Sequence, residues 1–394
     1  MKHFLFIITI GFVLACCTPM HMDQMERVDY SVLRWENTGF FDVAKFQRGD
    51  MKTLNLEEFT KILFFLDKNL TFRITALEYE TVDPNDNPVK ASGVVFHPLN
   101  KKSKGVIEAM PTARVNGVGA SDDMFAVEGI AALMGYTVIV PDLLGFGVSR
   151  EMTAPVLMAK NTGRVTYDLR CAVAQYLWDE FRFQLPAETV IMGYSMGGSS
   201  ALATQKYYET YHSNTVKVKE VRSGGGACDL PAAFAGYART GFSEFPAIPS
   251  TLFAFNHYYN LDLDFEQIFT GDLLINYPDW FSGNYSFDEM AKLLGSNLHA
   301  YMHEDFFKPF DQQNAEFKKL HPWLVVNSVS EGWRPKAPIY LFHAKNDTYV
   351  PLASAEEAVK KLRRAGANIS FTIYPGGHYT VGYLHFLCSI LSFL

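Results

Sequence analysis

The stretch "VIMGYSMGGSSAL", residues 190–202, places one serine among glycines at the point where an apolar run gives way to a helix-like pattern. Gly193 and Gly197 stand two positions on either side of Ser195 and complete a G-x-S-x-G pattern. This pattern is typical of a tight strand-to-helix turn that strains the serine backbone and needs neighbours without side chains. A Gly-rich turn without any chemical role has the same composition. Ser195 is therefore a candidate nucleophile only if the rest of the chain supplies a base and an acid.

A carboxylate and an imidazole follow this serine in the chain. A serine hydroxyl is a poor nucleophile near neutral pH, so it needs a base, and the base needs a carboxylate to orient it. Asp347 ends the apolar stretch "APIYLFHAKND" (337–347), and His378 comes just after "NISFTIYP" (368–375). All three residues follow predicted strands, at the end where open parallel sheets place their ligand crevice. Taken singly, Asp347 fits a turn and His378 fits a loop, but their order and placement together favour a catalytic triad.

Continuous apolar strands alternate with helical segments through most of the chain. A hairpin is predicted first, from residues 72–83 and 91–98 around the turn sequence "PNDNP". Further strands are expected within 105–111, 132–142, 188–195, 337–347 and 368–375, and helices within 166–181, 196–212, 354–366 and 376–394. Apolar strands of this kind indicate a mostly parallel sheet with helices on both faces, to which the hairpin adds an antiparallel edge. The predicted fold class is α/β.

Residues 229–334 interrupt this alternation. They are rich in aromatic residues, helical in pattern and too long for a loop in a compact domain. We interpret them as an inserted helical cap. We expect most of its aromatic residues to form the core of the cap and a few to line a substrate pocket. The residues considered are Phe234, Tyr237, Phe242, Phe253, Phe255, Tyr258 and Tyr259.

The N-terminus has the features of an export signal. Lys2 precedes an apolar run at 4–14, which is too short for a comfortable membrane span. The sequence Val-Leu-Ala-Cys at 13–16 resembles the lipobox of bacterial lipoproteins, in which the cysteine becomes lipidated. The chain is therefore expected either to be a bacterial lipoprotein, attached to a membrane through Cys16 in the periplasm or at the cell surface, or to be secreted after removal of a plain signal peptide.

These observations predict four parts of the chain. They are a signal peptide (1–15), an N-terminal lead-in segment with an amphipathic helix near 55–67 (16–70), a catalytic domain (71–228 and 335–394) and the cap (229–334).

The composition and net charge narrow the classes of function that the chain can have. The chain has 394 residues, 48% of them hydrophobic and 20% charged, which is typical of a globular protein. The net charge is −7 and the chain has no basic tract, so no nucleic acid partner is expected.

The cysteines and histidines predict no cofactor. One disulfide is possible among Cys171, Cys228 and Cys388. No HExxH or CxxC pair occurs, and we expect His299 and His303, four residues apart, to be structural. Neither a metal nor an organic cofactor is therefore expected, and the oligomeric state is left open.

With these motifs in place, the chain resembles the α/β hydrolases, and more narrowly the secreted lipase-type family with a helical cap. Residues 74–98 resemble the first hairpin of that family, and "GYTVIVPDLLGFGVSRE" (135–151) resembles its Asp-Tyr-x-Gly-x-Gly segment, with Leu143 in the tyrosine position. The elbow around Ser195, "PIYLFHAKNDTYVP" and "YPGGH" match its nucleophile, acid and histidine loops. The resemblance spans about 70–385.

The resemblance implies a serine hydrolase that cleaves small-molecule or lipid carboxylic esters through an acyl-enzyme. Such an enzyme needs backbone N–H groups that hold the developing oxyanion. One donor is expected at Met196, which follows the nucleophile at a helix N-terminus. The second is expected in the loop after the 105–111 strand, where relatives often carry His-Gly and this chain has "MPTARVNG". Thr112 and Ala113 are the candidates.

Three other functions use the same fold. A carbohydrate esterase that releases acetyl or feruloyl groups is chemically close to the main hypothesis. A serine peptidase needs a site that grips the peptide backbone or N-terminus, and none is evident in the sequence. A non-catalytic surface binding protein is disfavoured because all three members of the predicted triad are present.

Overall fold

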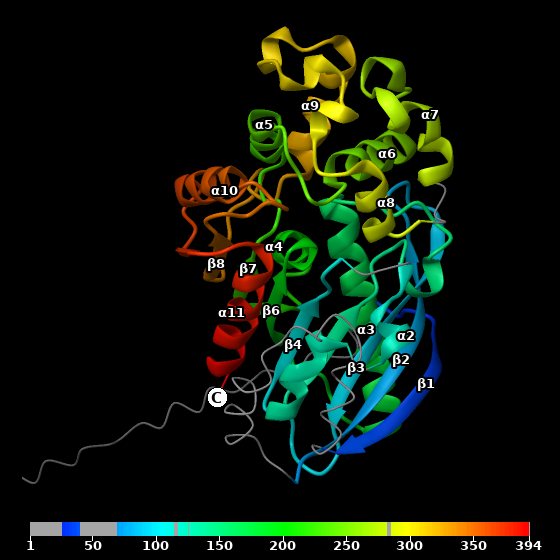
Figure 1. Ribbon diagram of the computed structural model, residues 1–394. Helices are drawn as coiled ribbons and strands as arrows, with labels where there is room; N and C mark the ends of the chain where they lie inside the picture. The colour runs from blue at the N-terminus through cyan, green and yellow to red at the C-terminus, as the bar shows by residue number, and fades with distance from the viewer. Residues whose placement is uncertain (1–25, 40–68, 114–116, 125, 282–284, 394) are drawn as a thin grey trace, which may run out of the picture.

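A nine-stranded sheet forms the centre of the computed structural model within the residues that it describes, which are 26–39, 69–113, 117–124, 126–281 and 285–393 (Figure 1). Its strand order is β1-β2-β3-β5-β4-β6-β7-β8-β9. The strands are β1 (Tyr30–Gly39), β2 (Thr71–Val82), β3 (Pro88–Pro98), β4 (Val106–Met110), β5 (Thr137–Pro141), β6 (Glu188–Tyr194), β7 (Lys217–Gly224), β8 (Ile339–Ala344) and β9 (Ile369–Tyr374). Pairing is antiparallel from β1 to β5 and parallel from β5 to β9, which confirms the predicted mostly parallel sheet.

Helices cover both faces of this sheet. One face packs on α3 (Ala159–Phe181), α4 (Met196–Tyr211) and α10 (Leu352–Arg364), and the other on the short helix η5 (Val127–Met134) and α11 (His378–Leu391). Two further short helices, α2 (Ala120–Asp123) and η6 (Gly147–Ser149), lie in the loops beside β4 and β5. Residues of β4 alternate between the two apolar clusters, so Val106 belongs to the first and Ile107 to the second. All five residues of β4 are buried, and four of them are apolar, with Glu108 as the exception.

The lead-in segment contains a strand that the sequence analysis did not predict. The expected hairpin forms as β2 and β3, but β1 pairs with β2 and takes the edge position. A register shift between Val32 and Arg34 interrupts the alternation of side chains in β1. Trp35 is 56% exposed. The period-two pattern that identifies a half-buried strand is therefore absent from this segment. Strand β7 was also not predicted.

A buried ion pair lies between the sheet and α3. Arg170 donates from Nη1 to Glu108 Oε1 at 2.5 Å, and both side chains are fully buried. The second carboxylate oxygen of Glu108 accepts from the Tyr208 hydroxyl at 2.5 Å, and Arg170 Nη2 donates to the Pro186 carbonyl at 2.5 Å. The pair thus joins β4 to α3, α4 and the segment before β6.

The residues that interrupt the alternation of strands and helices lie between β7 and β8, above the sheet in Figure 1. It contains α5 (Leu230–Thr240), α6 (Ala247–Tyr259), α7 (Gly271–Trp280), α8 (Phe287–Leu294) and α9 (Ala315–Asn327), and the short helices η7 (Phe265–Gln267), η8 (Leu298–Ala300), η9 (Glu304–Phe307) and η10 (Phe310–Gln312). Its two ends meet, because the Val329 N–H donates to the Cys228 carbonyl at 3.0 Å and the Leu230 N–H donates to Ser328 Oγ at 2.9 Å. We call residues 229–334 the insertion.

The aromatic residues of the insertion mainly form a core of their own. Tyr237, Phe255 and Tyr258 are buried in it, and Phe242 is exposed. Phe253 lines a cavity that is described below.

Several predictions concern residues outside the described ranges. They are the signal peptide, lipidation of Cys16 and the amphipathic helix near 55–67. Within the described ranges, Cys171, Cys228 and Cys388 are free thiols. No helix there combines the length and the apolar character that are needed to cross a bilayer.

Two buried histidines predict a loss of stability in mild acid. Burial lowers the pKa of His97 to about 4 and that of His385 to about 3, so both rings are neutral in the folded protein. An unfolded histidine titrates near 6.5, and the unfolded chain therefore binds more protons at lower pH. The free energy of unfolding should fall by about 1.4 kcal/mol per pH unit for each ring as the pH drops from 6.5 toward 4.

Urea denaturation at several pH values measures this slope. A His385→Leu variant should lose about 1.4 kcal/mol per pH unit less than the wild type over that range. Equal slopes in the two proteins would contradict a neutral, buried His385.

Candidate active site

Ser195 lies in a strained turn between β6 and α4. Its φ is 58° and its ψ is −126°, an uncommon conformation for a residue with a side chain. The flanking glycines are required by close backbone contacts: a Cβ on Gly193 would lie 2.3 Å from the Gly197 carbonyl oxygen, and one on Gly197 would lie 2.4 Å from the Met110 carbonyl oxygen. The G-x-S-x-G pattern therefore serves to bring three backbone segments together beneath the serine.

Ser195, Asp347 and His378 meet at the carboxyl ends of β6, β8 and β9. His378 Nε2 lies 2.8 Å from Ser195 Oγ, and His378 Nδ1 lies 2.8 Å from Asp347 Oδ2. An ionised carboxylate only accepts hydrogen bonds, so the Nδ1 proton points to Asp347 and Nε2 is free to accept from the serine hydroxyl. The imidazole is 5% exposed, and water has little access to this chain of hydrogen bonds.

The loop that carries Asp347 is held by its backbone and by a second histidine. Asp347 Oδ1 accepts from the N–H groups of Tyr349 at 2.9 Å and Val350 at 2.8 Å. His343, fully buried on β8, donates from Nε2 to the Val350 carbonyl at 3.0 Å. Burial lowers the pKa of His343, which keeps this ring neutral. The sequence analysis did not identify His343, although its position four residues before Asp347 on an apolar strand is a visible signal.

Aromatic rings enclose the imidazole of His378. The Tyr349 ring stacks on it, with centroids 4.9 Å apart and planes at 17°, and the Tyr194 ring lies 5.0 Å away. The Tyr194 hydroxyl donates to the His378 carbonyl at 2.6 Å and thereby fixes the start of α11. Tyr379, which is 60% exposed, packs its edge against Tyr349 and lies at the outer side of the site.

Two backbone segments near Ser195 offer N–H donors. Met196 is the first residue of α4, where N–H groups lack partners within the helix and the helix dipole favours negative charge. The Thr112 N–H already donates to Glu128 Oε1 at 3.1 Å, and Glu128 is buried on η5. Ala113 is thus the better second donor of the two residues that the sequence predicted. Residues 114–116 lie outside the described ranges.

A family comparison assigns most of the chain to a known family. The family model described as "Alpha/beta hydrolase family" matches residues 115–387, more than half of the chain. The chain belongs to the alpha/beta hydrolase family. The predicted resemblance to the α/β hydrolases and the predicted α/β fold class are thereby confirmed.

Individual relatives of this hydrolase are similar over different lengths. The secreted triacylglycerol lipase LIP7 of Malassezia globosa is 42% identical over 63 residues, which are 15% of this chain and 13% of that lipase. The secreted triacylglycerol lipase LIP3 of Malassezia restricta is 41% identical over 77 residues, 18% of this chain and 16% of that lipase. The chain therefore matches about a seventh of the length of these lipases. The rice cell wall degrading esterase LipA of Xanthomonas oryzae has a similar structure, with a TM-score of 0.71, 20% identity and coverage of 92% of this chain and 96% of LipA.

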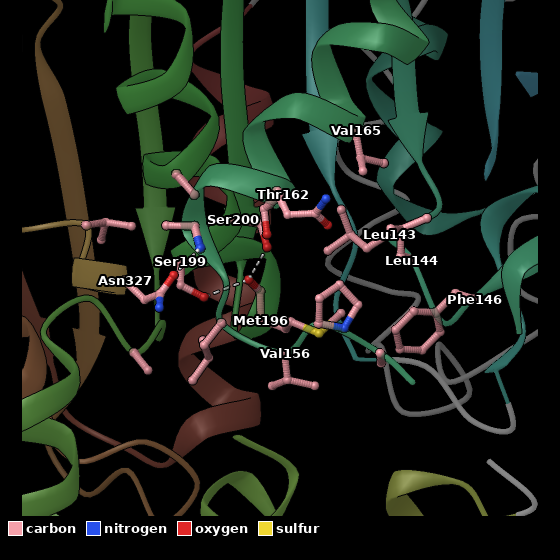
Figure 2. A pocket seen from close by; sticks show the side chains of 18 residues that line it. Leu143, Leu144, Phe146, Val156, Thr162, Val165, Met196, Ser199, Ser200 and Asn327 are labelled. Atoms are coloured by element: carbon pink, nitrogen blue, oxygen red, sulfur yellow. Dashed lines mark hydrogen bonds between the residues drawn. The ribbon is translucent and has the colours of Figure 1, made fainter. Parts of the chain in front are cut away.

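The hydrolase has a small cavity at the N-terminal end of α4. It has a volume of about 30 Å³, and Met196 forms part of its wall (Figure 2). Phe146 and Asn327 lie at opposite sides of this view with Met196 between them. The cavity thus extends along the N-terminal turn of α4.

The histidine pair at positions 299 and 303 has structural contacts in the hydrolase. His299 stacks on Phe307 at 3.8 Å, and His303 Nδ1 accepts from the Asp305 N–H at 3.2 Å. Within the described ranges, no group of three side chains is arranged to hold a metal ion.

Proposed function

We propose that this hydrolase cleaves carboxylic esters through an acyl-enzyme formed on Ser195. The observation that carries the proposal is the continuous hydrogen-bonded chain from Ser195 Oγ through both nitrogens of His378 to Asp347, with 2.8 Å at each link. A serine, a histidine and a carboxylate in this order perform nucleophilic acyl transfer on several unrelated folds.

In the first half of the reaction, Ser195 Oγ attacks the ester carbonyl carbon while His378 Nε2 takes the hydroxyl proton. The carbonyl electrons move to its oxygen, and the N–H groups of Met196 and Ala113 stabilise that oxyanion. When the tetrahedral intermediate collapses, the bond to the alcohol breaks, and the alcohol leaves with the proton from His378. Asp347 holds the imidazole in the required tautomer and stabilises its charged form.

In the second half, a water molecule replaces the alcohol. His378 takes one proton from the water as its oxygen attacks the acyl carbon, and it returns that proton to Ser195 Oγ when the intermediate collapses. The products are a carboxylic acid and the free enzyme. The groups named here supply the nucleophile, the proton transfers and the hydrogen bonds of both halves.

The relatives support an ester as the substrate. Two of them are named triacylglycerol lipases, and one structural neighbour is named an esterase that degrades rice cell wall. Export of this chain is proposed with the same support, because both lipases are named as secreted and the first 15 residues have the pattern of a signal peptide. Lipidation of Cys16, and the role of the insertion as a substrate cap, remain predictions.

Labelling with an alkyl fluorophosphonate tests this proposal. The serine oxygen should attack phosphorus and expel fluoride, which leaves a stable adduct on the peptide that contains Ser195. We expect one adduct per chain, together with complete loss of p-nitrophenyl ester hydrolysis. Protein unfolded in urea serves as the control, because its serine has no oriented base and should remain unlabelled.

An unmodified Ser195 in folded protein would contradict the proposed nucleophile. The same preparation can be assayed with feruloyl esters, acetylated sugars and peptides. Turnover of acetylated sugars or feruloyl esters alone would indicate the carbohydrate esterase, and turnover of peptides alone the peptidase. A folded protein that binds but hydrolyses none of these substrates would indicate a non-catalytic binding function.

A further inference from the structure

A second and larger cavity adjoins the small one. Its volume is about 120 Å³, and it lies between the loop after β5 and helices α6, α7 and α8 of the insertion. Three residues line both cavities, namely Phe146, Ala154 and Val156. We call these three residues the partition.

The two cavities differ in the length of chain that they can hold. The small cavity has room for about two or three water molecules, which is also the room that an acyl tail of a few carbons requires. The large cavity has room for about ten. An acyl group on Ser195 would enter the small cavity first, because Met196, the next residue, forms its wall.

The walls of the small cavity offer few hydrogen bonds to a guest. The hydroxyls of Ser199 and Ser200 both donate to the Met196 carbonyl, at 2.9 and 2.8 Å (Figure 2). The Thr162 hydroxyl donates to the Met158 carbonyl at 3.2 Å. Because these protons are used within the protein, the cavity is chemically suited to a hydrocarbon chain.

Phe146 is the bulkiest member of the partition, and its position is well fixed. The flanking glycines, Gly145 and Gly147, have φ values of 88° and 59°, in the left-handed region. The Phe146 ring is 6% exposed and lies 6.1 Å from the ring of Phe287, which lies 5.1 Å from that of Phe245. A row of rings from the insertion thus supports Phe146 from the side of the larger cavity.

We propose that the partition limits the acyl group of the substrate to short chains, and that Phe146 is the residue that determines this specificity. This inference rests on the proposed ester hydrolysis at Ser195. Removing the Phe146 ring would join the two cavities and give a longer acyl chain a path from Met196 to the space beneath α6 to α8.

The test measures kcat/KM for p-nitrophenyl esters from acetate to palmitate in wild type and in Phe146→Ala. The wild type should be most active on chains of two to about four carbons. In Phe146→Ala the ratio of kcat/KM for octanoate to that for butyrate should rise by roughly 10- to 200-fold, the range that a change of one methylene in an apolar pocket produces. Val156→Ala removes a smaller part of the partition, so the ratio should rise less.

Phe281→Ala is the matched control. Phe281 lines only the larger cavity, and its replacement loosens the insertion without opening the partition. The ratio should therefore stay at its wild-type value. If Phe146→Ala does not fold, Phe146→Leu keeps more of the side-chain volume and should raise the ratio in the same direction.

Three results would overturn the inference: a wild type most active on long chains, an unchanged ratio in both Phe146 variants, or an equal rise in Phe281→Ala. These results differ from a failure of the proposed function itself. In that case the wild type would hydrolyse no ester in a Ser195-dependent manner, whatever residue stands at position 146.

Discussion

Ser195→Ala is expected to lower kcat for short p-nitrophenyl esters by about four to six orders of magnitude. The variant lacks the atom that forms the acyl-enzyme, and His378 has no hydroxyl proton to remove. Only the oxyanion donors and the binding groups would remain, and these leave a small residual rate. Stopped-flow or steady-state assays with p-nitrophenyl butyrate measure the loss, and urea denaturation should show a fold as stable as that of the wild type.

Ser389→Ala provides the control for this prediction. Ser389 is buried on α11, and its hydroxyl has no hydrogen-bond partner within the described ranges. The same loss of one oxygen at this position should leave kcat unchanged. A residual activity of a tenth or more in Ser195→Ala would show that another group performs the chemistry.

Breaking the buried ion pair is expected to have the largest effect on stability. Glu108→Leu leaves the Arg170 guanidinium in the core without its carboxylate, and Arg170→Met leaves Glu108 without its cation. Either change should lower the free energy of unfolding by about 3–5 kcal/mol. The cost comes from the uncompensated buried charge, since both side chains are fully buried. Urea denaturation followed by tryptophan fluorescence measures it.

The double variant Glu108→Leu/Arg170→Met distinguishes this cause from a simple loss of packing. With both charges removed, most of the stability should return, because an apolar pair of similar volume can replace a buried ion pair. Tyr208 would then lose its acceptor and retain a residual cost of about 1–3 kcal/mol. A double variant as unstable as the sum of the two single variants would contradict the assigned role of the pair.

The fold was predictable from the sequence wherever a local pattern reflects burial. Strands such as β4 and β6 are buried along nearly their whole length, so apolar residues predominate in both, although β4 also contains the buried Glu108. The β2–β3 turn was predictable because Asp83 accepts from the N–H groups of Asn85 and Asn87, a common use of aspartate in turns. Strand β1 was missed because its register shift and exposed edge remove the alternating pattern.

The candidate site also contains some residues that the sequence predicted and others that it did not. The sequence predicted that Ser195, Asp347 and His378 come together, because they follow apolar strands in a recognisable order. It did not predict Glu128, whose partner Thr112 lies 16 residues earlier in the chain, or His343, whose ring supports the Asp347 loop through the Val350 carbonyl. The partition also lay beyond prediction, because it depends on how the loop after β5 packs against helices of the insertion.

The two ends of the insertion meet, and this bears on how α/β hydrolases can change in evolution. The Val329 N–H donates to the Cys228 carbonyl, so the two backbone segments that join the sheet to the insertion lie side by side. Segments of other lengths can replace the insertion in evolution without a new path for the backbone between β7 and β8. Such a replacement would leave the ends of β6, β8 and β9, where Ser195, Asp347 and His378 meet, in place.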